Sequence, residues 1–254
     1  MAIAGAGDLV TGFKSAVASM GVLSLVSGIL VLVLMPKNAA YGAASAEKAE
    51  KIGLKDYIST FKIPGVWIMS ILVWCYVTIS AVASYLTPYS TNVLGMSAVL
   101  ASSIGTIRTY GWIADKAFKS VSKEQVLGQA ACAVTLGLFL VLPTGISGGL
   151  LVVLLLLVGV AMFLCKGTYF SVQPELGIPT NVSATAVAIA TLIGYLPDMF
   201  VHTMFGKWID TYGEAGYTRI FIYGIGTAVL GIIAALLAVY IAHRNAKKAS
   251  GSVA

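Results

Sequence analysis

Long apolar runs constrain the fold of this chain more than any other feature of its sequence. Seven runs are long enough to cross a hydrocarbon core of roughly 30 Å, which takes about 20 residues of helix. The seven runs are Ser15 to Met35, Pro64 to Thr87, Gly95 to Ala114, Gln125 to Pro143, Gly148 to Ser171, Ser183 to Gly206 and Tyr217 to Ile241. They occupy well over half of the 254 residues, of which 58% are hydrophobic and 10% charged. Soluble domains are about one quarter charged, so we expect an all-α membrane protein with seven transmembrane helices.

The basic residues predict how these helices are oriented. If the loops alternate between two sides, one side collects eleven Lys and Arg residues and the other at most three. The larger group is Lys37, Lys48, Lys51, Lys55, Lys62, Lys116, Lys119, Lys123, Arg244, Lys247 and Lys248. The positive-inside rule then places the C-terminus in the cytoplasm and, with seven helices, the N-terminus outside. We expect a bacterial inner (plasma) membrane protein without a nucleic-acid partner, because the charges are scattered through loops. An outward N-terminus without a signal peptide suggests that a segment is missing upstream.

The longest connection between apolar runs divides the chain into four parts. Residues 1–36 form the first helix, and residues 37–63 form a cytoplasmic loop. In that loop apolar residues interleave with charged ones, which predicts a short amphipathic helix at the membrane surface. Residues 64–243 form a bundle of six helices, which Pro64 opens in the first turn, where helices tolerate proline. Residues 244–254 form a basic cytoplasmic tail.

A short motif recurs within the six-helix part. Gly111-Trp-Ile-Ala-Asp115 closes the third run, and Gly206-Lys-Trp-Ile-Asp210 closes the sixth, 95 residues later. The third and the sixth runs are each the second of three consecutive runs. Because three helices end on the side opposite to where they began, the second set of three enters the membrane from the opposite side. We therefore expect an inverted 3+3 repeat, which is typical of secondary transporters.

Several motifs resemble those of the major facilitator superfamily. Gly111-x-x-x-Asp115-Lys116 with its basic loop resembles the loop signature of that superfamily. Three further segments look like the tenth and eleventh helices of a bacterial branch: Lys166-Gly-Thr-Tyr-Phe with Pro174-Glu175, Ile193-Gly-Tyr-Leu-Pro-Asp198, and Gly206-x-x-x-Asp210-x-x-Gly213. The resemblance covers residues from about Ser15 to the C-terminus and matches the seven runs to helices six to twelve. Family members normally carry two six-helix halves, so the first five helices are lacking.

The resemblance implies transport by alternating access and a set of gating and structural residues. This set comprises Gly111, Asp115, Lys116, Glu175, Gly206 and Asp210. The carboxylate and base of the signature would bind neighbouring helix ends and stabilise one conformation of the cycle, as a carboxylate can at a helix N-terminus. The glycines would let helices approach closely, as would the pairs Ser24/Gly28 and Gly224/Ala228.

Ionisable residues within the runs are the candidates for contact with a solute. An ionisable side chain costs about 2.5 to 3.5 kcal/mol within a span and usually faces a cavity or a partner. Arg108 follows a stripe of small residues, and Lys166 shares a helix side with Tyr169. Both lie in the cytoplasmic half, so snorkelling of these side chains to the interface is the structural alternative.

Asp198 and His202 lie four residues apart in the sixth run and are candidates for proton coupling. A desolvated carboxylate beside an imidazole can form a proton relay. Structural interpretations stay open: Pro197 breaks the helix, so Asp198 would bond the freed backbone groups or pair with Lys207.

The second run carries an aromatic and hydroxyl-bearing face, with Trp67, Ser70, Trp74, Thr78, Ala81, Tyr85 and Pro88 at helical spacing. Trp67 suits an interfacial anchor, whereas Trp74 lies near the middle and would pack against another helix or a solute. Trp74, Tyr85 and Tyr169, with Arg108 and Lys166, are the expected substrate-binding residues.

The sequence favours a secondary transporter, or its C-terminal half, that moves a small polar and by preference anionic solute with proton coupling. Its partners would be the lipid bilayer, the solute, and either the missing N-terminal half or a second copy of the chain. The alternatives are a truncated or non-transporting membrane assembly module and a seven-helix receptor-like protein. We expect no enzyme, cofactor or metal, because the runs carry no HExxH, GxSxG, His cluster or paired carboxylates.

Overall fold

The computed structural model describes residues 9–34, 54–95, 120–142 and 147–251, which form two compact units, Met1–Gly53 and Leu54–Ala254. The first unit contains one described helix, α1 (Leu9–Leu34). Its apolar part, Val17–Leu30, is shorter than the spans of the second unit. The first predicted run is therefore helical over most of its length.

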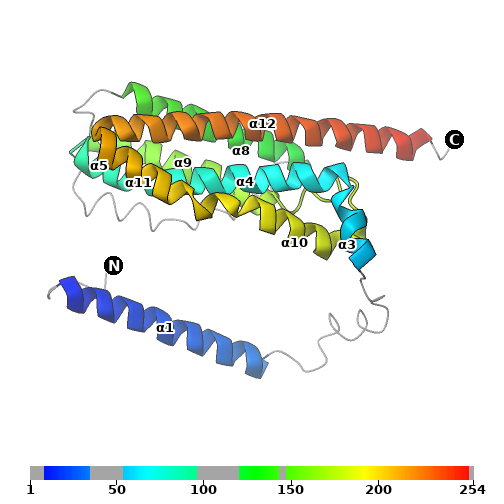
Figure 1. Ribbon diagram of the computed structural model, residues 1–254, viewed down its shortest axis with the longest axis horizontal. Coiled ribbons are helices and arrows are strands. Elements are labelled where there is room, and N and C mark those ends of the chain that lie inside the picture. Colours follow the sequence, from blue (N-terminus) through cyan, green and yellow to red (C-terminus); the bar gives the residue numbers. More distant parts are fainter. Residues whose placement is uncertain (1–8, 35–53, 96–119, 143–146, 252–254) are drawn as a thin grey trace. The chain divides into compact units, whose positions relative to one another are not determined.

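All the secondary-structure elements in the described residues of the second unit are helices (Figure 1). In chain order its elements are α3 (Leu54–Phe61), α4 (Pro64–Ser84), α5 (Leu86–Asn92), α8 (Val121–Val141), α9 (Gly148–Thr168), η1 (Thr180–Val182), α10 (Ser183–Gly194), η2 (Leu196–Met199), α11 (Val201–Tyr212) and α12 (Glu214–Gly251).

Five helical segments of this unit are long and apolar enough to cross a membrane. They are Pro64–Asn92, Val121–Val141, Gly148–Thr168, Thr180–Tyr212 and Glu214–Lys247. The prediction of an all-α membrane protein is thus confirmed, and five of the seven predicted runs are spans by length and composition. The third run, residues 95–114, lies almost entirely outside the described residues. The count of seven spans and the 3+3 repeat therefore stay predictions.

Apolar side chains from distant parts of the sequence build the core of the bundle. α12 packs against both α8 and α4, while α8 also packs against α9 and α10 against α4. At one end of the bundle, residues such as Met69, Leu72 and Ala235 are fully buried. At the other end, Leu136, Phe139 and Phe221 fill the interior. Close van der Waals packing of these side chains holds the helices together.

The helix boundaries agree with some predicted features and differ from others. Pro64 stands in the first turn of α4, as predicted. The predicted surface helix of the 37–63 loop is found as the eight residues of α3. Residues 244–251, within the predicted basic tail, continue α12 without interruption to Gly251. Figure 1 shows its C-terminal part extending past the neighbouring helices of this unit.

Close helix contacts occur at glycines that differ from most of those expected. A Cβ added at Gly224 would meet Leu136 and Val82 at 3.0 to 3.2 Å, as close approach requires. At Gly206 and Gly28 an added Cβ would meet no described atom within 4 Å. The tightest contacts between spans lie instead at Gly194, Gly231, Gly216 and Gly128.

Candidate functional site

The most distinctive feature of the bundle is a span whose helix is interrupted. The apolar segment Thr180–Tyr212 contains α10, the short 3-10 helix η2 and α11. Pro197 has no backbone N–H and cannot continue the α-helical pattern. The Asp198 N–H instead donates to the Tyr195 carbonyl at 3.1 Å, and the Phe200 N–H donates to the Pro197 carbonyl at 3.0 Å. The α-helical pattern resumes where the Met204 N–H donates to the Phe200 carbonyl at 2.9 Å.

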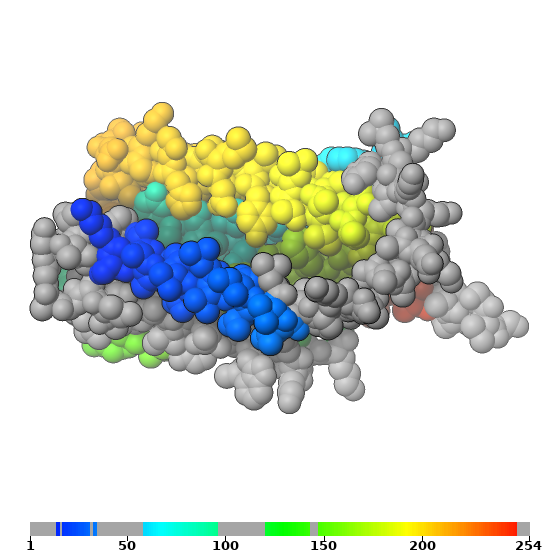
Figure 2. Space-filling model, turned by 90° about the horizontal axis from the view of Figure 1, so that it is seen from below, coloured from blue at the N-terminus to red at the C-terminus, as the bar shows by residue number. Residues whose placement is uncertain are grey.

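α4 holds this broken segment on one side. Gly194, at the end of α10, lies so close to Val73 that any side chain at this position would overlap it. Beyond the break, the Phe200 ring packs against that of Trp74, with 6.2 Å between ring centroids. Figure 2 shows the surface of α10 and α11, in yellow, running beside that of α4, in teal. The predicted aromatic face of the second run, which is α4, therefore contacts the interruption between α10 and α11.

Tyr85 joins the two helices beyond the break. Its hydroxyl donates a hydrogen bond to the His202 carbonyl at 3.2 Å. Its ring also stacks on the His202 ring, with centroids 6.1 Å apart, and meets Phe205 edge-on at 5.4 Å. Tyr85 itself ends α4, so its side chain fixes the start of α11 to the end of α4.

Replacing Tyr85 with phenylalanine is expected to lower the free energy of unfolding by about 1 kcal/mol. The phenylalanine keeps the ring contacts but removes the hydroxyl that donates to the His202 carbonyl. Thermal unfolding of the purified protein in mild detergent measures this change. Tyr212→Phe is the matched control, because the Tyr212 side chain is exposed at the end of α11. Equal unfolding midpoints for the two variants would contradict a structural role for the hydrogen bond.

Asp198 and His202 present polar groups on the exposed side of the broken span. Both side chains are exposed, and Asp198 lies near the midpoint of Thr180–Tyr212. Within the described part of the chain, the Asp198 carboxylate makes no hydrogen bond or ion pair. It therefore binds neither Lys207 nor the backbone groups that Pro197 leaves free. The helical register between the two residues is interrupted at Phe200, so they do not occupy adjacent turns of one α-helix.

The remaining predicted substrate contacts are divided between the surface and the core. Lys166 stands in the last turn of α9, and its side chain is exposed. Tyr169 is 5% exposed and packs against Tyr76 and Phe170, with ring centroids at 5.2 and 4.4 Å. Tyr169 therefore belongs to an aromatic cluster between spans. Arg108 lies outside the described residues, as do Gly111, Asp115 and Lys116.

Glu175 binds the start of another helix. Its carboxylate accepts hydrogen bonds from the backbone N–H groups of Val121 and Ser122, both at 2.9 Å, and from the Ser120 hydroxyl at 3.3 Å. These N–H groups have no partner within α8, because the first turn of a helix leaves its donors free. Burial works against ionisation of the carboxyl, but the contacts from Ser122, Val121 and Ser120 outweigh it and lower the pKa of Glu175 below its ordinary value. Asp210, the other described carboxylate of the predicted gating set, is exposed.

Two buried glutamines of α8 were missed by the sequence analysis. The Gln125 Nε2 donates to the Cys165 carbonyl at 2.8 Å and to the Thr168 hydroxyl at 2.7 Å. The Gln129 amide is buried against Gly231 of α12 and has no hydrogen-bond partner among the described residues. The sequence could have indicated them, because two amide side chains four residues apart lie on one face of a helix. In an apolar run, such a polar face is favourable only where it contacts other helices. In the described ranges no three His, Cys, Asp or Glu side chains gather as metal ligands would.

Comparison with known proteins places this chain beside bacterial inner membrane proteins. It is 29% identical over 238 residues to the inner membrane protein YqcE of Escherichia coli, covering 88% of this chain and 55% of that protein. It is 24% identical over 230 residues to the E. coli inner membrane protein YihN, covering 85% of this chain and 54% of that protein. A third relative, at 24% identity over 243 residues (84% of this chain, 51% of that protein), is an uncharacterized MG294 homolog of Mycoplasma pneumoniae. The chain thus spans about half the length of the curated relatives it matches.

These comparisons correct the placement in the major facilitator superfamily. No family model matches the chain, and the relatives are named as inner membrane or uncharacterized proteins rather than as members of that superfamily. No solved structure matches it either. The similarity to E. coli inner membrane proteins and the five apolar spans do support an inner membrane location.

Proposed function

We propose that this chain is part of a secondary transporter and that the broken span α10–η2–α11 lines the path of a small polar solute. The observation that carries the proposal is Asp198, which lies near the middle of an apolar span, is exposed and has no partner among the described residues. A carboxylate that faces lipid costs about 2.5 to 3.5 kcal/mol on insertion scales, so such groups face water or protein. Non-helical backbone within a membrane is likewise tolerated only where protein buries it or a water-filled cavity meets it.

The contacts of the break favour an aqueous path on its exposed side. α4 covers one side of the span through Gly194, Val73 and Trp74. Asp198 and Thr203 are exposed, and so is His202, whose ring stacks on Tyr85 at the end of α4. Because the chain spans only about half the length of the curated relatives, we infer that the remainder of a full-length protein, or a second copy, faces this side across the path.

Proton coupling is the second part of the proposal. Carboxylates and imidazoles within membrane spans are the side chains that form proton relays in transporters. Asp198 and His202 flank the interruption at Phe200, and Tyr85 holds the His202 backbone in place. Movement of the solute would then accompany protonation at this break. Arg108 and Lys166 remain the candidates that would favour an anionic solute.

Labelling of single cysteines with a charged, membrane-impermeant maleimide tests the path without knowledge of the solute. We expect Asp198→Cys and His202→Cys to react readily in membrane vesicles, because maleimides require a hydrated thiolate. Leu192→Cys and Leu237→Cys are the matched controls, since these leucines are 69% and 50% exposed on apolar helix faces and should stay unlabelled in lipid. The native Cys75, Cys132 and Cys165 are at most 1% exposed, which keeps the background low.

The labelling pattern decides the proposal. Labelling of the cysteines at residues 198 and 202, without labelling of those at residues 192 and 237, supports a water-accessible path. If none of the four cysteines reacts with the maleimide, the broken span lies in lipid or in a protein contact that excludes water, and the proposed path is contradicted. Reaction at all four positions would mean that the whole face is hydrated, and a path confined to the break would then be excluded.

A further inference from the structure

Two carboxamide side chains on neighbouring turns of α8 are fully buried between helices. Gln125 and Gln129 are both 0% exposed, and residues four apart on a helix have Cβ atoms about 5–6 Å apart. Gln125 faces α9, where its Nε2 donates to the Cys165 carbonyl and to the Thr168 hydroxyl. These two side chains, the amide pair, therefore lie one turn apart in the interior of the bundle.

Gln129 faces α12 at a position that has no side chain. A Cβ added at Gly231 would meet the Gln129 Cδ at 2.5 Å and its Oε1 at 2.6 Å. Ala228 and Ala235, one turn to either side of Gly231 on the same face of α12, are small and fully buried. Side chains of this size leave space beside the amide that a leucine would fill. The Gln129 amide is thus aimed at a face of α12 that is built from small, apolar residues.

Three polar atoms of the amide pair lack a hydrogen-bond partner in the part of the chain that the structure describes. They are the Nε2 and Oε1 of Gln129 and the Oε1 of Gln125. A buried polar atom without a hydrogen bond costs free energy, and within a membrane bulk water is not at hand to supply one. Such atoms in folded proteins are generally paired with ordered water when no protein group reaches them. The amide pair therefore calls for a bound partner.

The chemistry of the three atoms selects this partner. The two Oε1 atoms accept hydrogen bonds, whereas the Gln129 NH2 group donates them. A cation would satisfy the oxygens and repel the NH2 group, and an anion would do the reverse. A water molecule both donates and accepts, and in a buried site it typically makes about three hydrogen bonds. Water therefore matches all three atoms.

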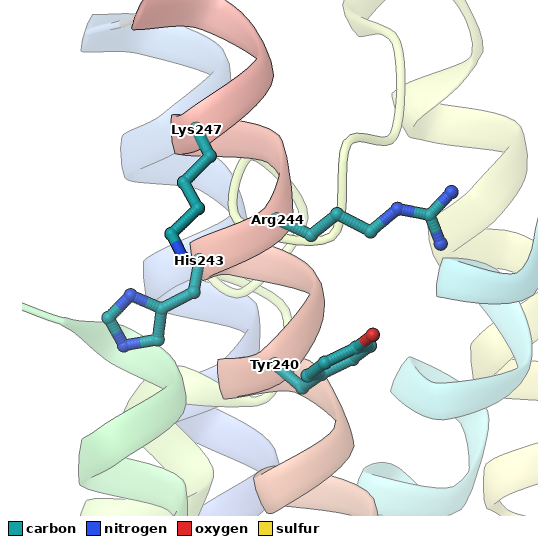
Figure 3. Close-up of a pocket in the computed structure, with 4 residues that line it drawn as sticks. All are labelled: Tyr240, His243, Arg244 and Lys247. Atoms are coloured by element: carbon teal, nitrogen blue, oxygen red, sulfur yellow. The ribbon is translucent and has the colours of Figure 1, made fainter.

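The pocket on the C-terminal part of α12 shows no comparable convergence of polar groups (Figure 3). Its described lining comes from one helix, and Arg244 extends to one side of α12 while Lys247 lies on the other. The amide pair, in contrast, lies where α8 packs against both α9 and α12.

We propose that the amide pair binds ordered water inside the bundle. One water molecule donates to the Gln125 Oε1 and accepts from the Gln129 Nε2, because these groups lie on neighbouring turns. A second water molecule donates to the Gln129 Oε1 beside Gly231. The contact between α8 and α12 then depends on bound water as well as on apolar packing. The site does not depend on the transport proposal, because it shares no residue with the broken span.

Nuclear magnetic resonance of the purified full chain in mild detergent tests this site. The chain contains three glutamines, Gln125, Gln129 and Gln173, so ¹⁵N labelling of glutamine alone gives three side-chain NH2 signals. Single substitutions to methionine assign them. We expect nuclear Overhauser transfer from water to the Gln129 NH2 protons, with the sign of a long-lived bound water. Absence of this transfer would overturn the proposal.

A matched pair of variants tests the bridge between the two amides. Gln125→Met removes the Oε1 acceptor, so the transfer from water to the Gln129 NH2 protons should lose most of its intensity. Thr168→Val is the control, because it also removes a hydrogen bond of Gln125 but leaves that Oε1 in place. This control should keep the wild-type intensity. An equal loss in both variants, or no loss in Gln125→Met, would overturn the bridge.

The stability of Gln129→Met separates a hydrated amide from an unhydrated one. Methionine has a similar length, so the variant removes the polar atoms with little change in volume. Loss of the bound water and of its bridge should lower the unfolding midpoint by about 2 to 4 °C. An unhydrated amide would be costly, so its removal would raise the midpoint; an equal or higher midpoint would overturn the proposal. A shift of the Gln129 signals when Na⁺ replaces N-methylglucamine would instead indicate a bound cation and would overturn the assignment to water.

Discussion

Replacing Gly194 with alanine is expected to lower the free energy of unfolding by about 1 to 3 kcal/mol, the usual cost of overpacking a helix contact. The added Cβ would overlap Val73 Cγ1, lie 2.5 Å from Val73 Cβ and stand 3.3 Å from the Ser70 carbonyl oxygen. Valine is branched at Cβ and cannot rotate out of the way. α10 would therefore have to move away from α4. Thermal unfolding followed by size-exclusion chromatography in detergent measures the loss.

Two further variants make this test specific. Gly226→Ala is the matched control, because a Cβ at Gly226 on α12 would meet no described atom within 4 Å. Alanine favours helix over glycine, so this variant should be neutral or slightly more stable. Val73→Ala combined with Gly194→Ala should recover part of the loss, since the double variant removes the overlapping methyl. If Gly194→Ala unfolds at the same temperature as Gly226→Ala, the contact between α4 and α10 is not as close as described.

Replacing Glu175 with glutamine is expected to destabilise the start of α8 by about 2 kcal/mol near neutral pH. The glutamine keeps one oxygen but turns an NH2 group toward backbone N–H donors. The wild-type carboxylate accepts from two such donors at 2.9 Å. Unfolding midpoints of the wild-type protein and of Glu175→Gln, measured at pH 7, give the difference.

The pH dependence of this difference has a definite sign. The folded-state pKa of Glu175 is lower than its ordinary value, so its contribution to stability is complete above the ordinary value of about 4.3. The contribution is lost as the pH falls through the lower, folded-state pKa. The two unfolding curves should therefore converge on acidification below about pH 4.3. Asp210→Asn is the control, because Asp210 is exposed and without a described partner; a similar convergence there would contradict the assignment to Glu175.

Hydropathy alone could predict most of the fold, because a span needs only length and apolarity. The interruption near Pro197 was also predictable, since proline removes a donor from any helix. The end of α12 could not be predicted from hydropathy. Its final residues are rich in Ala, Lys and Arg, which favour helix although Lys and Arg are not apolar. The superfamily placement rested on short patterns with few fixed positions, such as Gly-x-x-x-Asp, and patterns of that length recur by chance.

The candidate site was predictable only in its residue types. Trp74, Tyr85, Asp198 and His202 stand out in the sequence as polar or aromatic groups in apolar runs. Their partners do not, because Tyr85 reaches a carbonyl 117 residues away. The partners of Glu175 were equally hidden, since they precede it by 53 to 55 residues. Which glycine permits close approach also depends on the opposing helix, so Gly194 could not be preferred to Gly206 before the packing was known.

Glu175 also fixes how the bundle can deform. Its side chain binds the start of α8, and its backbone carbonyl accepts a hydrogen bond from Asn245 of α12 at 3.3 Å. Gly177, at a φ of +69°, leaves the space that the Asn245 amide occupies. The connection between α9 and α10 is thereby tied to two other helices at the same end. A motion that keeps these hydrogen bonds would pivot about this junction, and its amplitude would grow toward the opposite end of the bundle, where α11 turns into α12.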